Sequence, residues 1–252
     1  MRQGLPSIEI SDIDHDRFGV KTAKVTEVRP GDLEDIMRFC RRNKVEFLIA
    51  RCLTIDLKLA QEMESRGFQL MDTLIYYSCN LEKDPPPDTV SGTMIRPFRH
   101  GEETIISLIS AEAFEGYQGH YHADQRLDKN KCDDVYTDWA YKSCISRSAA
   151  DEVFVAEYEG KIIGFGTVKM ESSGQGHIIL AGVLKKYQGL GVYRSIFIHC
   201  MKWCLQQGLY SVLTSTQITN LAVQRVWIRL GFEPCSSYYT FHKWFGEVGN
   251  YG

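Results

Sequence analysis

The chain has 252 residues, of which 44% are hydrophobic and 24% charged, with a formal net charge of −3 and an isoelectric point near 6.2. This composition is typical of a globular protein with one large domain or two small ones, and the lack of a basic surplus argues against a nucleic-acid partner. No apolar run approaches the roughly 20 residues of a membrane-spanning helix and the N-terminus has no secretory signal, so we expect a cytoplasmic protein without a membrane partner.

The first roughly eighty residues predict a β-α-β-α-β pattern from their hydrophobic periodicity. The expected elements are a strand at 22–29, a helix at 32–42, a strand at 46–51, a helix capped by Asp56 and ended by Gly67, and a strand at 68–79. Three consecutive prolines at 85–87 follow, and neither a helix nor an interior strand can cross them. They predict a linker at 85–92 between a small domain at 1–84 and a larger one at 93–252.

The larger domain predicts a mixed sheet with helices on its faces, an α/β class of α+β character. Its expected strands are 93–98, 152–158, 161–170, 177–184, 210–216 and 232–244, and its expected helices are 102–114, 133–145, 190–206 and 221–230. The pair Glu159-Gly160 predicts a two-residue hairpin between two of the strands.

The sequence at the end of the first expected domain is similar to the sequence at the end of the second. Aligning Gly67-Phe68 with Gly231-Phe232 places Asp56 opposite Asn220, and both windows contain a short capped helix followed by an aromatic strand. Duplication and chance both explain this similarity. Because the first window has no glycine-bearing turn upstream, we expect a cofactor site only in the second.

That glycine-bearing turn is Gln188-Gly189-Leu190-Gly191-Val192-Tyr193, which joins an apolar strand to a helix. The first N–H groups of a helix lack intrahelical partners and carry the positive end of its dipole, and glycines let a phosphate approach them. The turn is neither a Walker loop nor a dinucleotide fingerprint. On these residues alone, a diphosphate cradle and an ordinary tight turn both stay open.

A polar stretch at 115–131 carries an aromatic and imidazole cluster of His120, Tyr121, His122 and Asp124. Such a cluster suits a polar ring with apolar edges, so we expect acceptor contacts. A loop without function is the alternative, and a metal site is not expected because the His-x-His-x-Asp pattern has no remote ligand motif. Further on, Tyr136 and Trp139 share a helical face and suit either core packing or acceptor stacking.

The turn and the helix that follows resemble the GNAT acyltransferases. Val183 followed by Gln188-Gly189-x-Gly191 is similar to their central motif, Q/R-x-x-G-x-G/A. Asn220-Leu221-Ala222-Val223, then Trp227 and Leu230-Gly231-Phe232, resembles their next motif, in which an asparagine opens a helix and Gly-Phe closes it. The chain departs from the family at Tyr193, where a glycine or alanine is usual, and at Trp227, where a tyrosine often acts as general acid.

The resemblance implies a GNAT fold preceded by a smaller, degenerate GNAT-like domain, and an acyl-CoA cofactor. The implied cofactor-binding residues are Ala181, Gly182, Val183, Gln188, Gly189, Leu190, Gly191, Val192, Tyr193 and Asn220. In such a site the backbone at 181–183 pairs with pantetheine where strands separate, the Val183 N–H stabilises a developing oxyanion, and the N–H groups at 188–193 bind the pyrophosphate. Asn220 touches the pantetheine arm. Tyr193 leaves open an acyl group longer than acetyl or hydroxylated.

The resemblance narrows to the TDP-fucosamine acetyltransferases, sugar-nucleotide N-acyltransferases with a small preceding domain. It is carried by the segments 67–74, 116–124, 216–220 and 236–244, and it covers about residues 22–245. It implies transfer of the acyl group to the amine of a nucleotide-linked amino-deoxysugar, such as a dTDP sugar of polysaccharide synthesis. The implied substrate-binding residues are Gln118, His120, Tyr121, His122, Asp124, Tyr136, Trp139 and Gln217.

Proton transfer has several candidates because an indole N–H is not an acid near neutral pH. We expect Tyr239 to protonate the departing thiolate, with Tyr238 and His242 as alternatives. The expected base is His120, with His122 or Asp124 as alternatives.

Other functions stay open on the sequence. They are a GNAT enzyme acting on a protein amine or on an antibiotic amine, and a CoA sensor without turnover. A homodimer is common for the fold.

Overall fold

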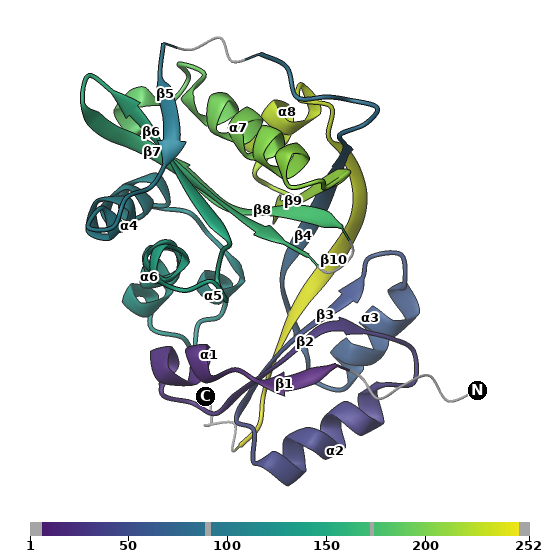
Figure 1. Ribbon diagram of the computed structural model, residues 1–252. Coiled ribbons are helices and arrows are strands. Elements are labelled where there is room, and N and C mark those ends of the chain that lie inside the picture. Colours follow the sequence, from purple (N-terminus) through teal and green to yellow (C-terminus); the bar gives the residue numbers. More distant parts are fainter. Residues whose placement is uncertain (1–6, 89–91, 172–173, 247–252) are drawn as a thin grey trace. The chain divides into compact units, whose positions relative to one another are not determined.

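The computed structural model describes residues 7–88, 92–171 and 174–246, and the chain divides into two compact units (Figure 1). The first unit draws its residues from 1–75, 118–132 and 236–252, and the second from 76–117 and 133–235. Residues 85–88 are neither helix nor strand, as the prolines require. The expected division at 85–92 differs from this division into compact units, and as a statement about domains it stays a prediction.

The first unit is a small sheet with the strand order β1-β2-β3-β10. Strands β2 and β3 are parallel, whereas β1 and β10 run antiparallel to their neighbours. Its elements are β1 (Ile8–Ile10), α1 (Asp12–Phe18), β2 (Thr22–Val28), α2 (Leu33–Asn43), β3 (Phe47–Leu53), α3 (Leu57–Ser65), the beginning of β4 (Gln69–Asn80), α5 (His120–Ala123) and most of β10 (Glu233–Trp244).

The two faces of this sheet differ in chemistry because side chains alternate along each strand. On one face, Phe241 and the partly buried Tyr239 pack into a hydrophobic core with residues of α2 and α3, among them Ile36 and Met63. On the other face, the His242 ring lies edge-on to Phe47, with 4.7 Å between centroids. This second face carries the buried polar groups of the unit.

Local sequence signals for turns and caps are confirmed. The Asp56 side chain accepts a hydrogen bond from the Leu59 N–H at 3.0 Å and so begins α3. Glu159 and Gly160 have φ angles of 50° and 72°, which both central positions of a type I′ hairpin turn require.

The second unit is a mixed sheet with helices on its faces, as expected from the sequence. Its strands lie in the order β4-β9-β8-β7-β6-β5. No helix among the described residues of either unit is long and apolar enough to cross a membrane. Its further elements are β5 (Met94–Pro97), α4 (Glu103–Ala113), α6 (Lys129–Ile145), β6 (Glu152–Tyr158), β7 (Lys161–Met170), β8 (Gln175–Val183), the 3-10 turn η1 (Lys185–Tyr187), α7 (Val192–Gln206), β9 (Ser211–Gln217) and α8 (Leu221–Ile228).

Helix α7 packs against β7 (Figure 1), and glycines of β7 lie at the contact. A Cβ atom at Gly166 would come within 2.4 Å of Ile196 Cγ2 and 3.5 Å of Cys200 Sγ. On the opposite face, a Cβ at Gly182 would come within 3.0 Å of Ala113 in α4. The glycines therefore set the depth at which the helices pack, and with it the position of the N-terminus of α7.

Gly166→Ala should lower the free energy of unfolding by about 1–3 kcal/mol, the usual cost of overfilling a packed core. The fully buried Ile196 has to move to admit the added methyl group. Urea unfolding monitored by circular dichroism measures the change. Gly92→Ala is the matched control, because a Cβ at Gly92 meets no atom within 4 Å, and equal midpoints for the two variants would contradict the close packing.

Several elements differ from those predicted by the sequence. Strand β1 and helix α1 were not predicted, because a three-residue strand and a seven-residue, mostly polar helix show little periodicity. Helix α6 begins at Lys129, four residues earlier than expected, and α5 interrupts the expected loop. Helix α7 begins at Val192 and excludes Leu190, because Gly191 at its N-cap has a φ of 81°.

Candidate functional site

In the second unit, strand β8 separates from β9 toward its C-terminal end. The parallel pairing of β8 with β9 runs from Gln175 opposite Ser211 to His177 opposite Leu213, and the Thr214 hydroxyl then donates to the Ile178 carbonyl at 3.0 Å. The pairing of β8 with β7 instead continues to Val183. Within the described residues, the last part of β8 therefore has a paired strand on its β7 side only.

The pairing phase identifies which backbone groups face this opening. The Leu184 N–H donates to the Ile163 carbonyl at 2.9 Å. Because bonded and non-bonded pairs alternate in an antiparallel ladder, the backbone groups of Gly182 point toward β7, and those of Ala181 and Val183 point away from it. The family resemblance implied that all three residues present backbone groups to pantetheine. Only the backbone groups of Ala181 and Val183 point toward the opening.

The turn after β8 leaves a set of N–H groups without partners. Gly189 and Gly191 have φ angles of 77° and 81°, and a Cβ at either would meet no atom within 4 Å. The first backbone bond into α7 runs from the Ser195 N–H to the Gly191 carbonyl at 3.0 Å. In the described chain, the N–H groups from Gly189 to Arg194 have no acceptor, so they suit the two phosphates of CoA.

Gln188 has a different role from the one expected. Its N–H already donates to the Lys185 carbonyl at 3.2 Å, so it does not join the phosphate-binding groups. Its side-chain amide donates to the Val183 carbonyl at 3.1 Å. Gln188 thus ties the start of the turn to the end of β8 and occupies the Val183 carbonyl while leaving the N–H of that residue directed at the opening.

A small polar group lies at the end of β9. Thr216 Oγ1 is 3.3 Å from the Tyr117 hydroxyl and accepts a hydrogen bond from Asn220 Nδ2 at 3.0 Å. Asn220 begins α8 as expected but makes no side-chain cap bond, and Gln217 is buried on the same strand end. Tyr117 and Thr216 lie in segments that carry the family resemblance but were not among the predicted site residues, although the end of a strand in an α/β sheet is a recurrent place for ligand contacts.

Tyr193 and Trp227, the two departures from the family motifs, belong to one aromatic group. The Tyr193 ring stacks on Phe197 with 4.8 Å between centroids, and Phe197 lies 5.8 Å from the Trp227 ring. Burial raises the pKa of the Tyr193 phenol well above its ordinary value, with the neighbouring Trp227 acting in the opposite direction. Tyr193 therefore stays protonated at neutral pH and fills space beside the indole.

The expected acceptor residues Tyr136 and Trp139 lie in different surroundings. Tyr136 stacks on Phe114, with 4.4 Å between centroids and 7° between planes, and lies edge-on to Tyr117. Trp139 is 38% exposed. Tyr136 therefore packs among other aromatic side chains, whereas the Trp139 indole is accessible to a ligand.

The remaining candidates lie in the first unit, where most side chains of the predicted cluster are buried and hydrogen-bonded to other residues of the unit. The Tyr121 hydroxyl donates to Asp14 Oδ1 at 2.8 Å. Asp124 is 2% exposed, with Oδ1 bonded to the Arg126 N–H and Oδ2 to His242 and Trp244. These contacts leave no accessible carboxylate for an acceptor, so the expected role of Asp124 in direct acceptor contact does not agree with its burial.

His120 differs from its neighbours in the cluster. Its Nδ1 atom lies 2.9 Å from Nε2 of His242, and within the described part of the chain its Nε2 atom has no hydrogen-bond partner. His122 Nδ1 accepts from the Gly119 N–H, and Gln118 is exposed. In residues 7–88, 92–171 and 174–246, no three His, Cys, Asp or Glu side chains are arranged to hold a metal ion.

The two residues expected to act as acid and base do not lie together. Tyr239 packs on the hydrophobic face of the first unit's sheet, whereas His120 contacts His242 on the polar face. Successive residues of β10 point to alternate faces of the sheet. Tyr239 and His242 therefore point to opposite faces, and His120 lies on the face of His242. The structure therefore does not bring the expected acid and base to one place.

Comparisons with known proteins agree with the second unit's architecture. Residues 111–232 match the sequence model of the Acetyltransferase (GNAT) family. A tandem GNAT protein from the clavulanic acid biosynthesis pathway is similar in fold, with a TM-score of 0.64 and 15% identity over 92% of this chain and 77% of that one. A GCN5-related N-acetyltransferase from Sphaerobacter thermophilus has a TM-score of 0.63 and 16% identity over 88% of this chain and 73% of that one.

Two curated relatives are similar in sequence. The spore coat polysaccharide biosynthesis protein SpsD of Bacillus subtilis is 22% identical over 151 residues, which are 60% of this chain and 50% of the relative. The mycothiol acetyltransferase of Acidothermus cellulolyticus is 27% identical over 211 residues, which are 75% of this chain and 60% of the relative. The chain thus spans half to three fifths of these relatives. Residues 111–232, just under half of the chain, are thus similar to the GNAT acetyltransferase family, and the two solved structures confirm the expected GNAT fold.

Proposed function

We propose that the protein is an N-acyltransferase that moves an acyl group from acyl-CoA to the amine of a nucleotide-linked amino-deoxysugar. The GNAT match supports acyl-CoA as the donor. The similarity to a spore coat polysaccharide biosynthesis protein supports a sugar acceptor. A dTDP-linked sugar is the proposed form of the acceptor.

The backbone of the second unit supplies donor binding and polarisation in this proposal. The free N–H groups from Gly189 to Arg194 would bind the pyrophosphate, and the outward backbone groups of Ala181 would pair with pantetheine. The Val183 N–H would donate to the thioester oxygen as negative charge develops on it. Such a preorganised donor contributes about 3–4 kcal/mol of transition-state stabilisation. The proton of the attacking amine would pass to His120.

The observation that carries the proposal is the open, unpartnered N–H array at the start of α7. Gly191→Val should raise the dissociation constant for CoA at least about tenfold, because the side chain fills the space in front of the N–H groups and the φ of 81° becomes strained. Isothermal titration calorimetry measures this change. Gly208→Val is the matched control, since Gly208 has a φ of 76°, an equally open surrounding and a place after the other end of α7.

Absence of CoA binding by the folded wild-type protein would overturn the proposal, and so would equal weakening by the two valine variants. The acceptor is tested separately by CoA release with a panel of amines. Turnover with nucleotide amino sugars supports the proposal.

A second candidate is acetylation of another small amine, favoured by the similarity to a mycothiol acetyltransferase. Turnover only with amines that carry no nucleotide would select this second candidate.

A further inference from the structure

Three side chains of the first unit form a continuous hydrogen-bonded line on the polar face of its sheet. Asp124 Oδ2 is 2.8 Å from Nδ1 of His242, and Nε2 of His242 is 2.9 Å from Nδ1 of His120. His242 lies on β10 and is fully buried, Asp124 follows α5, and His120 begins it. His120 is 9% exposed and stands at the end of the line.

The position of each hydrogen in this line follows from Asp124. The Trp244 indole N–H, which only donates, also bonds to Asp124 Oδ2 at 2.9 Å. Burial acts to raise the pKa of Asp124, but the hydrogen bonds from His242, Trp244 and Arg126 outweigh it, so the pKa lies below its ordinary value. The carboxylate is therefore ionised at neutral pH and accepts from His242.

The tautomer of each neutral imidazole then determines the tautomer of the next one. With its hydrogen on Nδ1, His242 accepts at Nε2, so His120 must donate from its own Nδ1. This arrangement leaves a lone pair on Nε2 of His120. Since that nitrogen has no partner among the described residues, the line ends in a free proton acceptor.

We propose that Asp124 and His242 are positioning residues that hold His120 in its Nδ1–H tautomer, so that Nε2 takes the proton of the acceptor amine. The inference rests on the proposed acyltransferase function and adds two residues to it. In the step, the amine nitrogen bonds to the thioester carbon, and the C–S bond breaks with its electron pair on sulfur. The amine proton moves to Nε2 of His120, which later returns it to solvent.

The charges around His120 keep it neutral and ready to accept. Burial is the largest influence that lowers its pKa well below the usual value, followed by His242 on β10, Arg51 on β3, Lys24 on β2 and His122 on α5. Burial likewise lowers the pKa of His242, against the opposing effect of the carboxylates of Asp124 and Asp72. The proton-accepting form of the line therefore persists at pH values below about 6.5, the usual histidine value.

Nitrogen-15 NMR tests the tautomer directly and needs no substrate. Long-range proton–nitrogen spectra of the labelled wild-type protein should show His120 protonated at Nδ1 and not at Nε2. The chain has seven histidines, and loss of one ring pattern in His120→Gln assigns the signal. A wild-type His120 that carries its proton on Nε2 overturns the proposal, whatever the activity.

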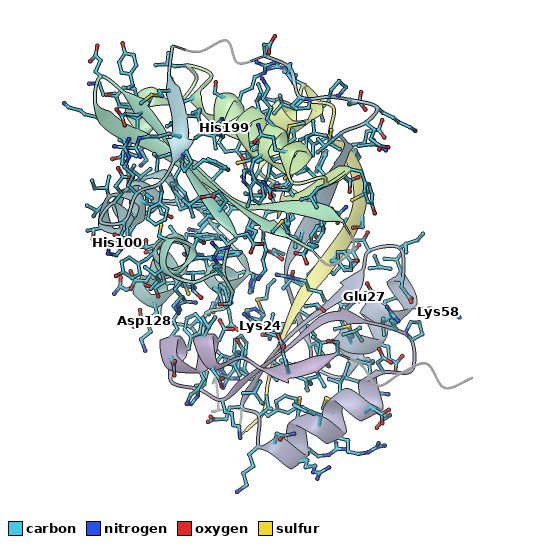
Figure 2. The ribbon with its side chains drawn as sticks, in the orientation of Figure 1. Lys24, Glu27, Lys58, His100, Asp128 and His199 are labelled. Carbon is cyan, nitrogen blue, oxygen red and sulfur yellow. The ribbon has the colours of Figure 1, made fainter. Side chains whose placement is uncertain are left out.

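The double variant Asp124→Asn/Trp244→Phe tests the direction of the line. Without the indole N–H, which would hold the asparagine carbonyl oxygen in place, the asparagine amide can donate to His242 Nδ1, which reverses both rings and places a hydrogen on Nε2 of His120. Trp244→Phe alone keeps the Asp124 carboxylate and should keep the wild-type tautomer. In the double variant we expect the NMR pattern of His120 to reverse and kcat/KM to fall about 100-fold, within the usual range of a general base, with an unchanged dissociation constant for CoA. His100 is exposed and is labelled in Figure 2. The variant His100→Gln is the control and should keep full activity.

The pH dependence separates positioning from a structural role. In the wild type, kcat/KM divided by the fraction of neutral acceptor amine should stay constant down to a pH below about 6.5, because the remaining fall in rate occurs when His120 becomes protonated. A folded Asp124→Asn/Trp244→Phe protein with kcat/KM within threefold of the Trp244→Phe protein overturns the proposal. If that variant fails to fold, the wild-type tautomer and pH profile still decide. Failure of CoA binding in calorimetry marks failure of the proposed function instead, because the tautomer is measured independently.

Discussion

Replacing the Val183 amide by an ester should lower kcat by about 10²–10³-fold, the usual effect of removing one oxyanion donor. Incorporating the α-hydroxy analogue of valine removes only the N–H and keeps the side chain. The pairing phase of β7 and β8 directs this N–H away from β7, and the Val183 carbonyl is already bonded to Gln188. The lost donor is therefore one that acts on the reacting carbonyl in the proposed function. Steady-state kinetics with saturating acyl-CoA measures the effect.

The control for the ester is the same substitution at Glu159, in the hairpin turn between Tyr158 and Lys161, which should leave kcat unchanged. An ester at Ala181, which also faces the opening, should instead raise KM for acyl-CoA, because its N–H would contact pantetheine and not the reacting carbonyl. A Val183 ester with unchanged kcat would show that another group stabilises the oxyanion.

Asp14→Asn should lower the free energy of unfolding by about 3 kcal/mol at pH 7, the lower end for breaking a buried ion pair. Asp14 is fully buried, and the ammonium of Lys24, labelled in Figure 2, lies 2.5 Å from its Oδ2 atom. Hydrogen bonds from Ser11 and from the Tyr121 hydroxyl also reach this carboxylate. The lower end applies because Lys24 is one-third exposed and keeps part of its hydration.

The loss of stability in Asp14→Asn should be smaller at acid pH than at pH 7. Burial acts to raise the pKa of Asp14, but the charge of Lys24 and the hydrogen bonds from Lys24, Ser11 and Tyr121 outweigh it, so the pKa is lowered. A group whose pKa is lower in the folded state stabilises the fold above its unfolded pKa of about 3.9. That contribution disappears as the pH falls through the lowered value. The difference between wild type and Asp14→Asn should therefore shrink below about pH 4.

Chemical unfolding at pH 7 and at pH 3 measures both effects. Asp16→Asn is the matched control, because Asp16 lies on the same helix and is exposed. A loss that is equal for Asp14 and Asp16, or that grows at low pH, would contradict the assignment of Asp14 as a buried, ionised partner of Lys24.

The donor-binding part of the site follows from local sequence rules, whereas its finer geometry does not. Glycines after a buried strand, an asparagine before the next helix and a Glu-Gly hairpin each have one strong local interpretation, and the structure has the expected elements there. The pairing phase that turns Gly182 toward β7 and Val183 away from it depends on the register of two strands. Nothing in the residues at 181–183 encodes that phase.

The histidine cluster illustrates a second limit. The sequence places His120 and Asp124 four residues apart, but it gives no sign that His242 lies between them in space. The partner comes from β10, more than a hundred residues away: the hydrogen bonds of His242 to His120 and Asp124 span 122 and 118 positions. Alternation along β10 also separates Tyr239 from His242, although the two are close in sequence.

The late arrival of β10 also affects how the protein folds during synthesis. Thr54 and Ser237 are 183 positions apart, yet their hydroxyl groups are 2.5 Å from each other at the start of the β3–β10 ladder. A ribosome therefore releases β3 long before its antiparallel neighbour exists, and the edge of β3 stays unpaired while the residues between the two strands are made. Closing so long a loop is slow, and an unpaired strand edge can pair with other chains during this interval.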